Sequence, residues 1–205
     1  MKTEFIIFRH GQTDWNQEHR SMGTTDIPLN RLGKQQAEML ATRLSRERLD
    51  VCYTSPLSRA KETMERVARL HHLPVTILED LREMNLGLFE GKLKSDRLIL
   101  FPDFDPGNDK HRRRLRMDTF AQWISNLKTN TIPALIQKHD GQTIALSTHD
   151  QKMRALLVAF GMPEEIKRLV LKNCAITKIS VDNGVMAVIF HNDTSHLDNT
   201  TIHGR

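Results

Sequence analysis

The amino-acid sequence predicts an α/β fold, in which a mostly parallel sheet is covered by helices on both faces and has an antiparallel edge. Short apolar segments of strand length alternate with longer segments whose apolar residues recur every three or four positions, as in amphipathic helices. The last two strand-like segments are separated only by Asp182-Asn183-Gly184, a hairpin-turn signal. This alternation is typical of a three-layer α/β/α sandwich.

The composition is that of an ordinary globular protein, and the length of 205 residues suits one domain, which we expect to span residues 1–205. Hydrophobic residues make up 39% and charged residues 27% of the chain. No apolar run approaches the roughly 20 residues that cross a bilayer, and the N-terminus lacks signal-peptide architecture. We therefore expect a cytoplasmic protein that does not bind a membrane. Cys52 and Cys174 lie in apolar contexts without metal-ligand spacing and are expected to be buried free thiols.

The first half of the chain is expected to contain three strands and two helices. An apolar strand begins at Thr3 and ends at the triplet Arg9-His10-Gly11. Asn30 has the position of a helix N-cap, and Pro56 has that of an early helical residue. The remaining elements are a helix over 31–47, a strand over 49–54, a helix from 55 to about 70 and a strand over 74–78.

The second half begins with a weakly patterned stretch, of which residues 101–107 are expected to form a loop or a short helix. A long helix is predicted over 119–139, with Pro133 bending it or lying near a helix junction. The tail from residue 191 is polar and expected to be only partly ordered. The other elements are a strand over 142–147, helices over 151–160 and 163–171, and strands over 175–181 and 185–190.

Charged and titratable side chains follow several of the predicted strands. Arg9 and His10 end the first strand, Arg59 lies in the first helical turn after the second, and His149 follows the fourth. Glu83 comes shortly after the third strand. Because ligands of open α/β sheets bind beyond the carboxyl ends of the strands, these residues are expected to converge on one site.

The chemistry of this set suits phosphoryl transfer through a phosphohistidine. A neutral imidazole at His10 can attack phosphorus in line. Arg9, Arg59 and a protonated His149 would stabilise the negative charge of the transferring group. Glu83 could protonate the leaving alkoxide and then accept a proton from water. The sequence offers no carboxylate pair arranged to hold a metal, so no metal and no cofactor is expected.

Several segments, in the same order along the chain, resemble the motifs of the histidine phosphatase superfamily, which has the phosphoglycerate mutase-like fold. The resemblance covers roughly residues 3 to 198 and is similar to the phosphatase branch at the closing strands. The segments are Arg9-His10-Gly11-Gln12-Thr13-Asp14-Trp15-Asn16, the loop with Arg20, Gly23 and Asp26-Ile27-Pro28-Leu29, Tyr53 to Ala60, Leu81-Arg82-Glu83 with Gly87 to Gly91, Ser147-Thr148-His149 with Arg154 to Leu157, Asn173 to Thr177, and Asn192 to Leu197.

This resemblance implies roles for individual residues. His10 would be the nucleophile, Glu83 the proton donor, and Arg9, Arg59 and His149 the phosphate pocket. Further substrate or phosphate contacts would come from Asn16, Gly11, Thr13, Gly23 and Arg20. The implied substrate is a small phosphorylated metabolite.

Two residues depart from the pattern of the superfamily. Asp150 follows the second histidine, where a glycine is usual, and its carboxylate would repel a phosphate unless it points away or pairs with a cation. Met22 replaces the Gln or Thr found in phosphatase and mutase members, so one polar contact is expected to be lost. Either change is expected to lower activity or narrow the substrate range.

Three functions are compatible with these observations. A phosphatase is favoured, because the segment over about 92–119 is shorter than the insertion of mutase members. The alternatives are a phosphoglycerate mutase-type phosphotransferase and a weakly active member that binds a phospho-ligand or a protein. The basic run Lys110 to Arg116 is either a solvated face or a collar that attracts anionic substrates. Nucleic-acid binding is not expected, since no aromatic residues interleave with this run. A homodimer could form through the edge of the terminal hairpin.

Overall fold

The computed structural model describes residues 1–197, and the side chains of residues 97 and 98 are not described. One six-stranded sheet has the order β3-β2-β4-β1-β5-β6. The pairs β3–β2, β2–β4 and β4–β1 are parallel, whereas β1–β5 and β5–β6 are antiparallel. The predicted α/β fold with an antiparallel edge is therefore confirmed. The strands are β1 (Thr3–Arg9), β2 (Val51–Thr54), β3 (Val75–Ile77), β4 (Thr143–Thr148), β5 (Ile176–Asp182) and β6 (Val185–Asp193).

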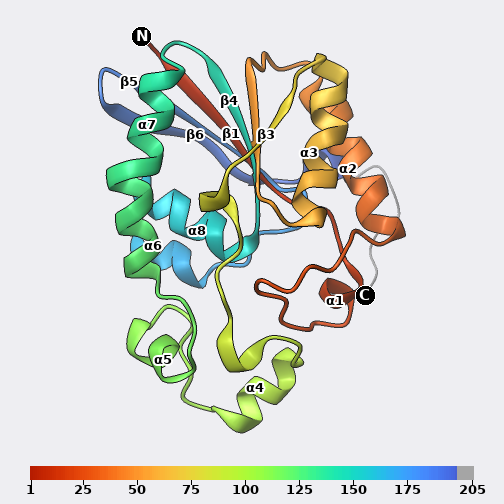
Figure 1. Cartoon of the computed structure of the whole chain (residues 1–205), viewed down its shortest axis with the longest axis vertical. Helices are drawn as coiled ribbons and strands as arrows, with labels where there is room; N and C mark the ends of the chain where they lie inside the picture. The colour runs from red at the N-terminus through yellow and green to blue at the C-terminus, as the bar shows by residue number, and fades with distance from the viewer. Residues whose placement is uncertain (198–205) are drawn as a thin grey trace.

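Helices cover both faces of the sheet (Figure 1). On one face α2 (Arg31–Leu44) and α3 (Ser58–His71) pack against Ile6, Phe8 and Cys52. On the other face α6 (Phe120–Asn126), α7 (Ile132–Lys138) and α8 (Asp150–Ala159) pack against Phe5 and Ile7. Successive side chains of β1 thus enter opposite cores, which is the alternation that a strand buried on both faces requires.

A smaller unit, which we call the cap, comprises residues 82–118 and extends from the carboxyl-terminal side of the sheet (Figure 1). It contains η2 (Gly87–Phe89), α4 (Lys94–Leu100) and α5 (Asp109–Arg114), and residues 101–107 form the expected loop. Its own apolar cluster consists of Leu86, Phe89, Leu115 and Met117. A further 3-10 turn, η1 (Glu79–Leu81), leads from β3 into the cap.

The long helix predicted over 119–139 consists of α6 and α7 joined by a π-helical segment, Leu127–Thr131. Pro133 lies in the first turn of α7. Proline lacks an N–H group and its ring collides with the carbonyl four residues earlier, so a π-helical turn at this point lets the helix continue. The predicted junction at Pro133 is confirmed. No helix among the described residues has the length and apolar character to cross a membrane.

Three predicted boundaries are wrong. Pro56 precedes α3 rather than starting it, since the helix begins at Ser58. Only Glu164–Arg168 of the predicted 163–171 helix is helical, and it is a 3-10 helix. The polar tail begins later than expected, because β6 pairs with β5 as far as Asp193 and η5 (Ser195–Leu197) follows. The rest of that tail, residues 198–205, lies outside the described residues.

The strand β6 forms an open edge of the sheet. It follows the predicted tight turn, in which Asn183 and Gly184 both have positive φ angles. Four of its large apolar side chains are exposed: Val185, Met186, Val188 and Ile189. Pairing of a second copy of the chain at this edge stays a prediction.

Candidate active site

A cavity of ≈ 230 Å³ lies between the carboxyl ends of the parallel strands and the cap. Its lining includes most of the site residues predicted from the sequence: Arg9, His10, Asn16, Arg20, Gly23, Arg59 and Glu83. Gly11, Thr13 and His149 are absent from this lining and lie behind it. The fold therefore brings together residues that are far apart in the sequence.

His10 lies just beyond β1, and its side chain is buried. Its Nδ1 is 2.6 Å from the carbonyl oxygen of Gly11. Because a carbonyl can only accept, Nδ1 carries the proton and Nε2 keeps its lone pair. Burial lowers the pKa of His10 well below its usual value, and Arg59 and Arg9 lower it further. His10 is thus neutral at pH 7, with Nε2 as its nucleophilic atom.

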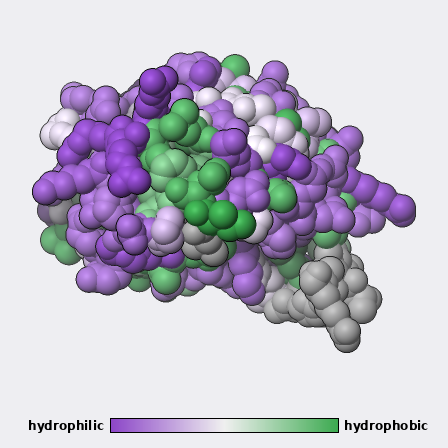
Figure 2. Space-filling view, turned by 90° about the horizontal axis from the view of Figure 1, so that it is seen from below, coloured by the Kyte–Doolittle hydropathy of each residue, from purple (hydrophilic) through white to green (hydrophobic). Residues whose placement is uncertain are grey.

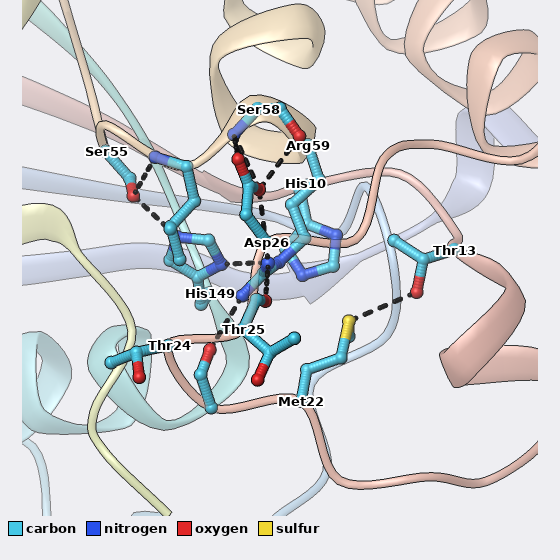
Figure 3. A network of polar contacts seen from close by, with 12 residues as sticks. His10, Thr13, Met22, Thr24, Thr25, Asp26, Ser55, Ser58, Arg59 and His149 are labelled. Atoms are coloured by element: carbon cyan, nitrogen blue, oxygen red, sulfur yellow. Dashed lines mark hydrogen bonds and ion pairs between the residues drawn. The ribbon is translucent and has the colours of Figure 1, made fainter. Parts of the chain in front are cut away.

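His149 is fully buried beside His10, and the two ring centres are 5.1 Å apart. Its Nδ1 accepts a hydrogen bond from Arg59 Nε at 3.2 Å, so Nε2 carries the proton and donates to Ser55 Oγ at 2.7 Å (Figure 3). Burial, with Arg59 as the next cause, lowers the pKa of His149 well below its usual value. The expectation of a protonated His149 is therefore wrong for the ligand-free site, where this ring orients Arg59.

Arg59 lies in the first turn of α3 and is fully buried. Its guanidinium donates to the carbonyl oxygens of Gly23 and Thr25, both at 2.9 Å. Burial lowers its pKa to about 10, so it stays charged at neutral pH. Asp26 of the same loop accepts hydrogen bonds from the backbone and side chain of Ser58 (Figure 3). These contacts fix the Gly23–Asp26 loop to the start of α3.

Arg9 ends β1, and its side chain is buried at the edge of the cavity. One terminal nitrogen donates to the carbonyl oxygen of Leu171 at 2.5 Å. Its Nε is buried and has no hydrogen-bond partner within residues 1–197. A buried donor of this kind is costly unless a ligand satisfies it, which suits the oxygen of a bound phosphate.

Glu83 is buried against the start of α8. Its carboxylate accepts hydrogen bonds from the backbone N–H groups of Met84, Gln151 and Lys152 at 2.8, 3.2 and 3.0 Å. It supplies the capping contact that the N-cap residue His149 does not make with its own side chain. Burial, followed by the charge of Asp150, raises the pKa of Glu83 above its usual value. A raised pKa suits a carboxyl group that must deliver a proton.

Asp150 does not point its charge freely at the cavity. Its carboxylate pairs with Arg154, one helical turn later, and accepts the backbone N–H of Leu171 at 3.1 Å. Arg154 in turn donates to the carbonyl oxygen of Lys167 at 2.9 Å. The carboxylate expected to repel phosphate is therefore paired with a cation, which was the condition set for tolerating it.

The loop after β1 is held by residues behind the cavity wall. Thr13 and Asn16 form a capping box at the start of α1 (Asp14–Gln17). The hydroxyl of Thr13 also donates to Met22 Sδ at 3.3 Å, so Met22 keeps one polar contact with the protein (Figure 3). A Cβ atom at Gly11 would lie 2.3 Å from the carbonyl oxygen of Gly33 in α2. Gly11 and Thr13 therefore position the loop rather than line the cavity.

Glu90 is a structural residue of the site that the sequence analysis did not single out. Its carboxylate accepts hydrogen bonds from the backbone and hydroxyl groups of both Thr24 and Thr25. Gly23 has a φ of +55°, and a Cβ atom there would lie 2.1 Å from Glu90 Oε1. The Gly87–Gly91 motif contains this residue, so its place beside the proton donor was the available signal. Asn173 was missed too; its amide donates to Asn16 Oδ1 at 3.2 Å.

The basic run 110–116 does not line the main cavity. Arg113 and Arg114 are exposed on α5, whereas Arg112 is fully buried. Arg112 donates to the carbonyl oxygens of Asp118 and Pro106, and its guanidinium carbon lies 4.7 Å from the centre of the Phe120 ring. This arginine therefore ties the cap together. Within the described residues, no group of three or more His, Cys, Asp or Glu side chains could hold a metal ion.

Comparisons with known proteins agree with this geometry. The family model of the histidine phosphatase superfamily (branch 1) matches residues 5–194. An uncharacterised phosphatase, PhoE of Bacillus subtilis, is 29% identical over 95% of this chain and 97% of its own. Phosphoserine phosphatase 1 of Hydrogenobacter thermophilus is 30% identical over 76% of this chain and 75% of its own. The solved structure of Bacillus stearothermophilus YhfR superposes with a TM-score of 0.85 at 30% identity, covering 95% of this chain and 99% of that one. The chain thus belongs to the histidine phosphatase superfamily.

Proposed function

We propose that the protein is a metal-independent phosphomonoester hydrolase that works through a phosphohistidine at His10 on a small phosphorylated metabolite. The observation that carries this proposal is the neutral, buried imidazole of His10, whose Nδ1–H is held by Gly11 and whose Nε2 is left as the attacking atom. Buried thiols at Cys52 and Cys174 suit a reducing compartment, so we place the reaction in the cytoplasm.

In the first step, the Nε2 lone pair of His10 attacks phosphorus while the bond from phosphorus to the ester oxygen breaks. Glu83, protonated through its raised pKa, gives its proton to the leaving alkoxide. The guanidinium groups of Arg9 and Arg59 stabilise the charge on the transferring oxygens, assisted by the amide of Asn16.

In the second step, the Glu83 carboxylate takes a proton from water, and the resulting hydroxide oxygen attacks phosphorus. The bond from phosphorus to Nε2 breaks, its electron pair returns to His10, and inorganic phosphate is released. Glu83 is then protonated and His10 neutral again, so both groups are reset for the next cycle. The hydrogen bond from His10 Nδ1 to Gly11 stabilises the positive charge on the ring while the phosphoryl group is attached.

The test is phosphate release from p-nitrophenyl phosphate between acidic and neutral pH without added metal, followed by a panel of sugar phosphates, nucleotides and phosphoserine. Wild type is compared with His10→Ala, and intact-mass spectrometry after acid quenching looks for a phosphorylated protein. We expect turnover and a phosphoprotein in wild type only. Full turnover by His10→Ala would contradict the proposal.

A phosphoglycerate mutase-type transferase is the second candidate, because a probable phosphoglycerate mutase, GpmB of Shigella boydii, is 29% identical over 95% of this chain. Hydrolysis is favoured by the short cap, which leaves the cavity open to water. Isomerisation of phosphoglycerate that is stimulated by a bisphosphoglycerate primer and exceeds phosphate release would instead favour the transferase.

A weakly active member that binds a phospho-ligand or a protein is the third candidate. Its motive was the pair Asp150 and Met22, and both side chains make contacts within the protein. Tight binding of inorganic phosphate without turnover of any ester, restored by Asp150→Gly, would favour this reading.

A further inference from the structure

The part of the cavity beyond the phosphate-binding residues has apolar walls. They are formed by Met22 and the cap residues Leu86, Phe89, Phe104, Pro106 and Met117, with Val170 on the opposite rim. Met22, Leu86, Phe89 and Met117 are each less than 9% exposed, so their apolar faces are fixed by packing. This wall lies on the side of the cavity that the leaving group of a phosphate ester must occupy, because Glu83 also borders it.

Phe104 forms a yielding part of this wall. Its ring packs edge-on against Phe89, with ring centres 5.2 Å apart, and Phe101 packs on Phe89 in the same way at 5.4 Å. Behind Phe104 lies a second small cavity of ≈ 30 Å³, lined mainly by Phe101, Pro102 and Leu115. A displaced Phe104 ring therefore has space to enter, and the main cavity can lengthen for a larger apolar group.

The arginines at the rim are already paired within the protein. Arg20 binds Glu18 at 2.9 Å, Arg168 binds Asp105 at 2.6 Å, and Arg154 binds Asp150. A second anionic group on the substrate would have to replace one of these carboxylates. The rim therefore gives little preference for a substrate with a carboxylate or a second phosphate next to the ester.

We propose that this wall is an apolar subsite and that the preferred substrates are phosphomonoesters whose alcohol carries an alkyl or aryl group close to the ester oxygen. The inference rests on the proposed function. Hydroxyl groups placed against these side chains would lose their hydration without gaining partners, whereas methylene groups would be stabilised by leaving water. Met22, which replaces a polar residue common in relatives, extends the same wall to the level of the phosphate.

Seen from the side of α4 and α5, the surface carries an apolar area surrounded by hydrophilic residues (Figure 2). The cap contributes the exposed side chains of Leu88, Ile99 and Leu100 to its outer surface. The apolar character of the cap is thus not confined to its interior, and chains longer than the cavity would still meet apolar surface on leaving it.

The experiment measures kcat/KM for ethyl, propyl, butyl and hexyl phosphate and for glycerol 3-phosphate, which has the same number of carbons as propyl phosphate. We expect kcat/KM to rise by up to about fourfold for each methylene that enters the subsite. Propyl phosphate should exceed glycerol 3-phosphate by about tenfold or more. The hydroxylated alcohol is the slightly better leaving group, so chemistry alone would give the opposite order.

Binding of the corresponding alkyl phosphonates, measured by calorimetry, gives a readout that does not need turnover. Affinity that rises with chain length supports the subsite even if no ester is hydrolysed, in which case only the proposed reaction fails. Affinity and kcat/KM that are both independent of chain length would overturn the subsite, and so would a preference for glycerol 3-phosphate.

Variants locate the effect. Phe104→Ala and Met117→Ala should each reduce the gain per methylene, and Met22→Gln should lower the ratio of propyl to glycerol phosphate. Leu88→Ala is the matched control, because Leu88 is a cap residue that does not line the cavity. Inhibition by inorganic phosphate should stay within about twofold of wild type in all four, which shows that the phosphate pocket is intact. A cap variant with an unchanged methylene series would remove that residue from the subsite.

Discussion

Lys152 is a fully buried lysine of α8 whose ammonium makes no hydrogen bond within residues 1–197. Its Nζ lies 2.7 Å from the centre of the Trp123 ring. Burial lowers the pKa of Lys152 to about 7, although the charges of Glu83, Asp80 and Asp118 act in the opposite direction. Two opposing effects therefore determine the free energy of this charge: the loss of hydration and the attraction of the ring.

The magnitudes decide which effect is larger. One pKa unit corresponds to about 1.4 kcal/mol, so lowering the pKa from 10.5 to about 7 amounts to roughly 5 kcal/mol against the buried ammonium. A cation on a Trp face in a desolvated site is stabilised by about 2 kcal/mol. We therefore expect Lys152→Met to raise the free energy of unfolding by about 2–3 kcal/mol at pH 7, because the thioether fills the space without a charge.

The pH dependence gives the sharper test. Because the folded-state pKa lies below the unfolded value, the unfolded chain binds more protons between about pH 7 and 10.5, and stability rises with pH in that window. Urea unfolding of wild type should show a rise of about 1–2 kcal/mol between pH 7 and 9 that Lys152→Met lacks. Lys128→Met, on the exposed side of the helical segment after Trp123, is the control and should keep the rise. Equal pH slopes for wild type and Lys152→Met would refute the reasoning.

Two further substitutions test the catalytic side of the cavity. Asp150→Asn removes a charge that raises the pKa of Glu83, so the alkaline limb of the kcat profile, where Glu83 loses its proton, should move to lower pH; an unchanged profile would mean that Asp150 does not act on Glu83. Gly23→Ala places a Cβ atom 2.1 Å from Glu90 Oε1 at a positive φ, which should displace the loop that holds Arg59. We expect kcat/KM to fall by about tenfold or more and the melting temperature to drop by several degrees; wild-type kinetics would show that the loop adapts.

The sheet and its order of functional residues were predictable because the signals are local. The apolar run that ends at Arg9 and His10 defines a buried strand and places both residues at its carboxyl end. The turn at Asn183 and Gly184 defines the terminal hairpin for the same reason. The boundaries that failed, at Pro56 and in the residues after Pro163, depend on contacts that compete with local propensity.

The sequence by itself therefore determined the α/β architecture and the set of residues gathered at one edge of the sheet. Only the tertiary structure decided how these groups behave. The neutral state of His149 follows from a hydrogen bond with Arg59, 90 positions earlier, and from complete burial. The pairing of Asp150 and the apolar wall around Phe104 likewise depend on which distant side chains meet. Protonation and specificity are set by desolvation and by the partners at hydrogen-bond distance, and a linear pattern carries neither.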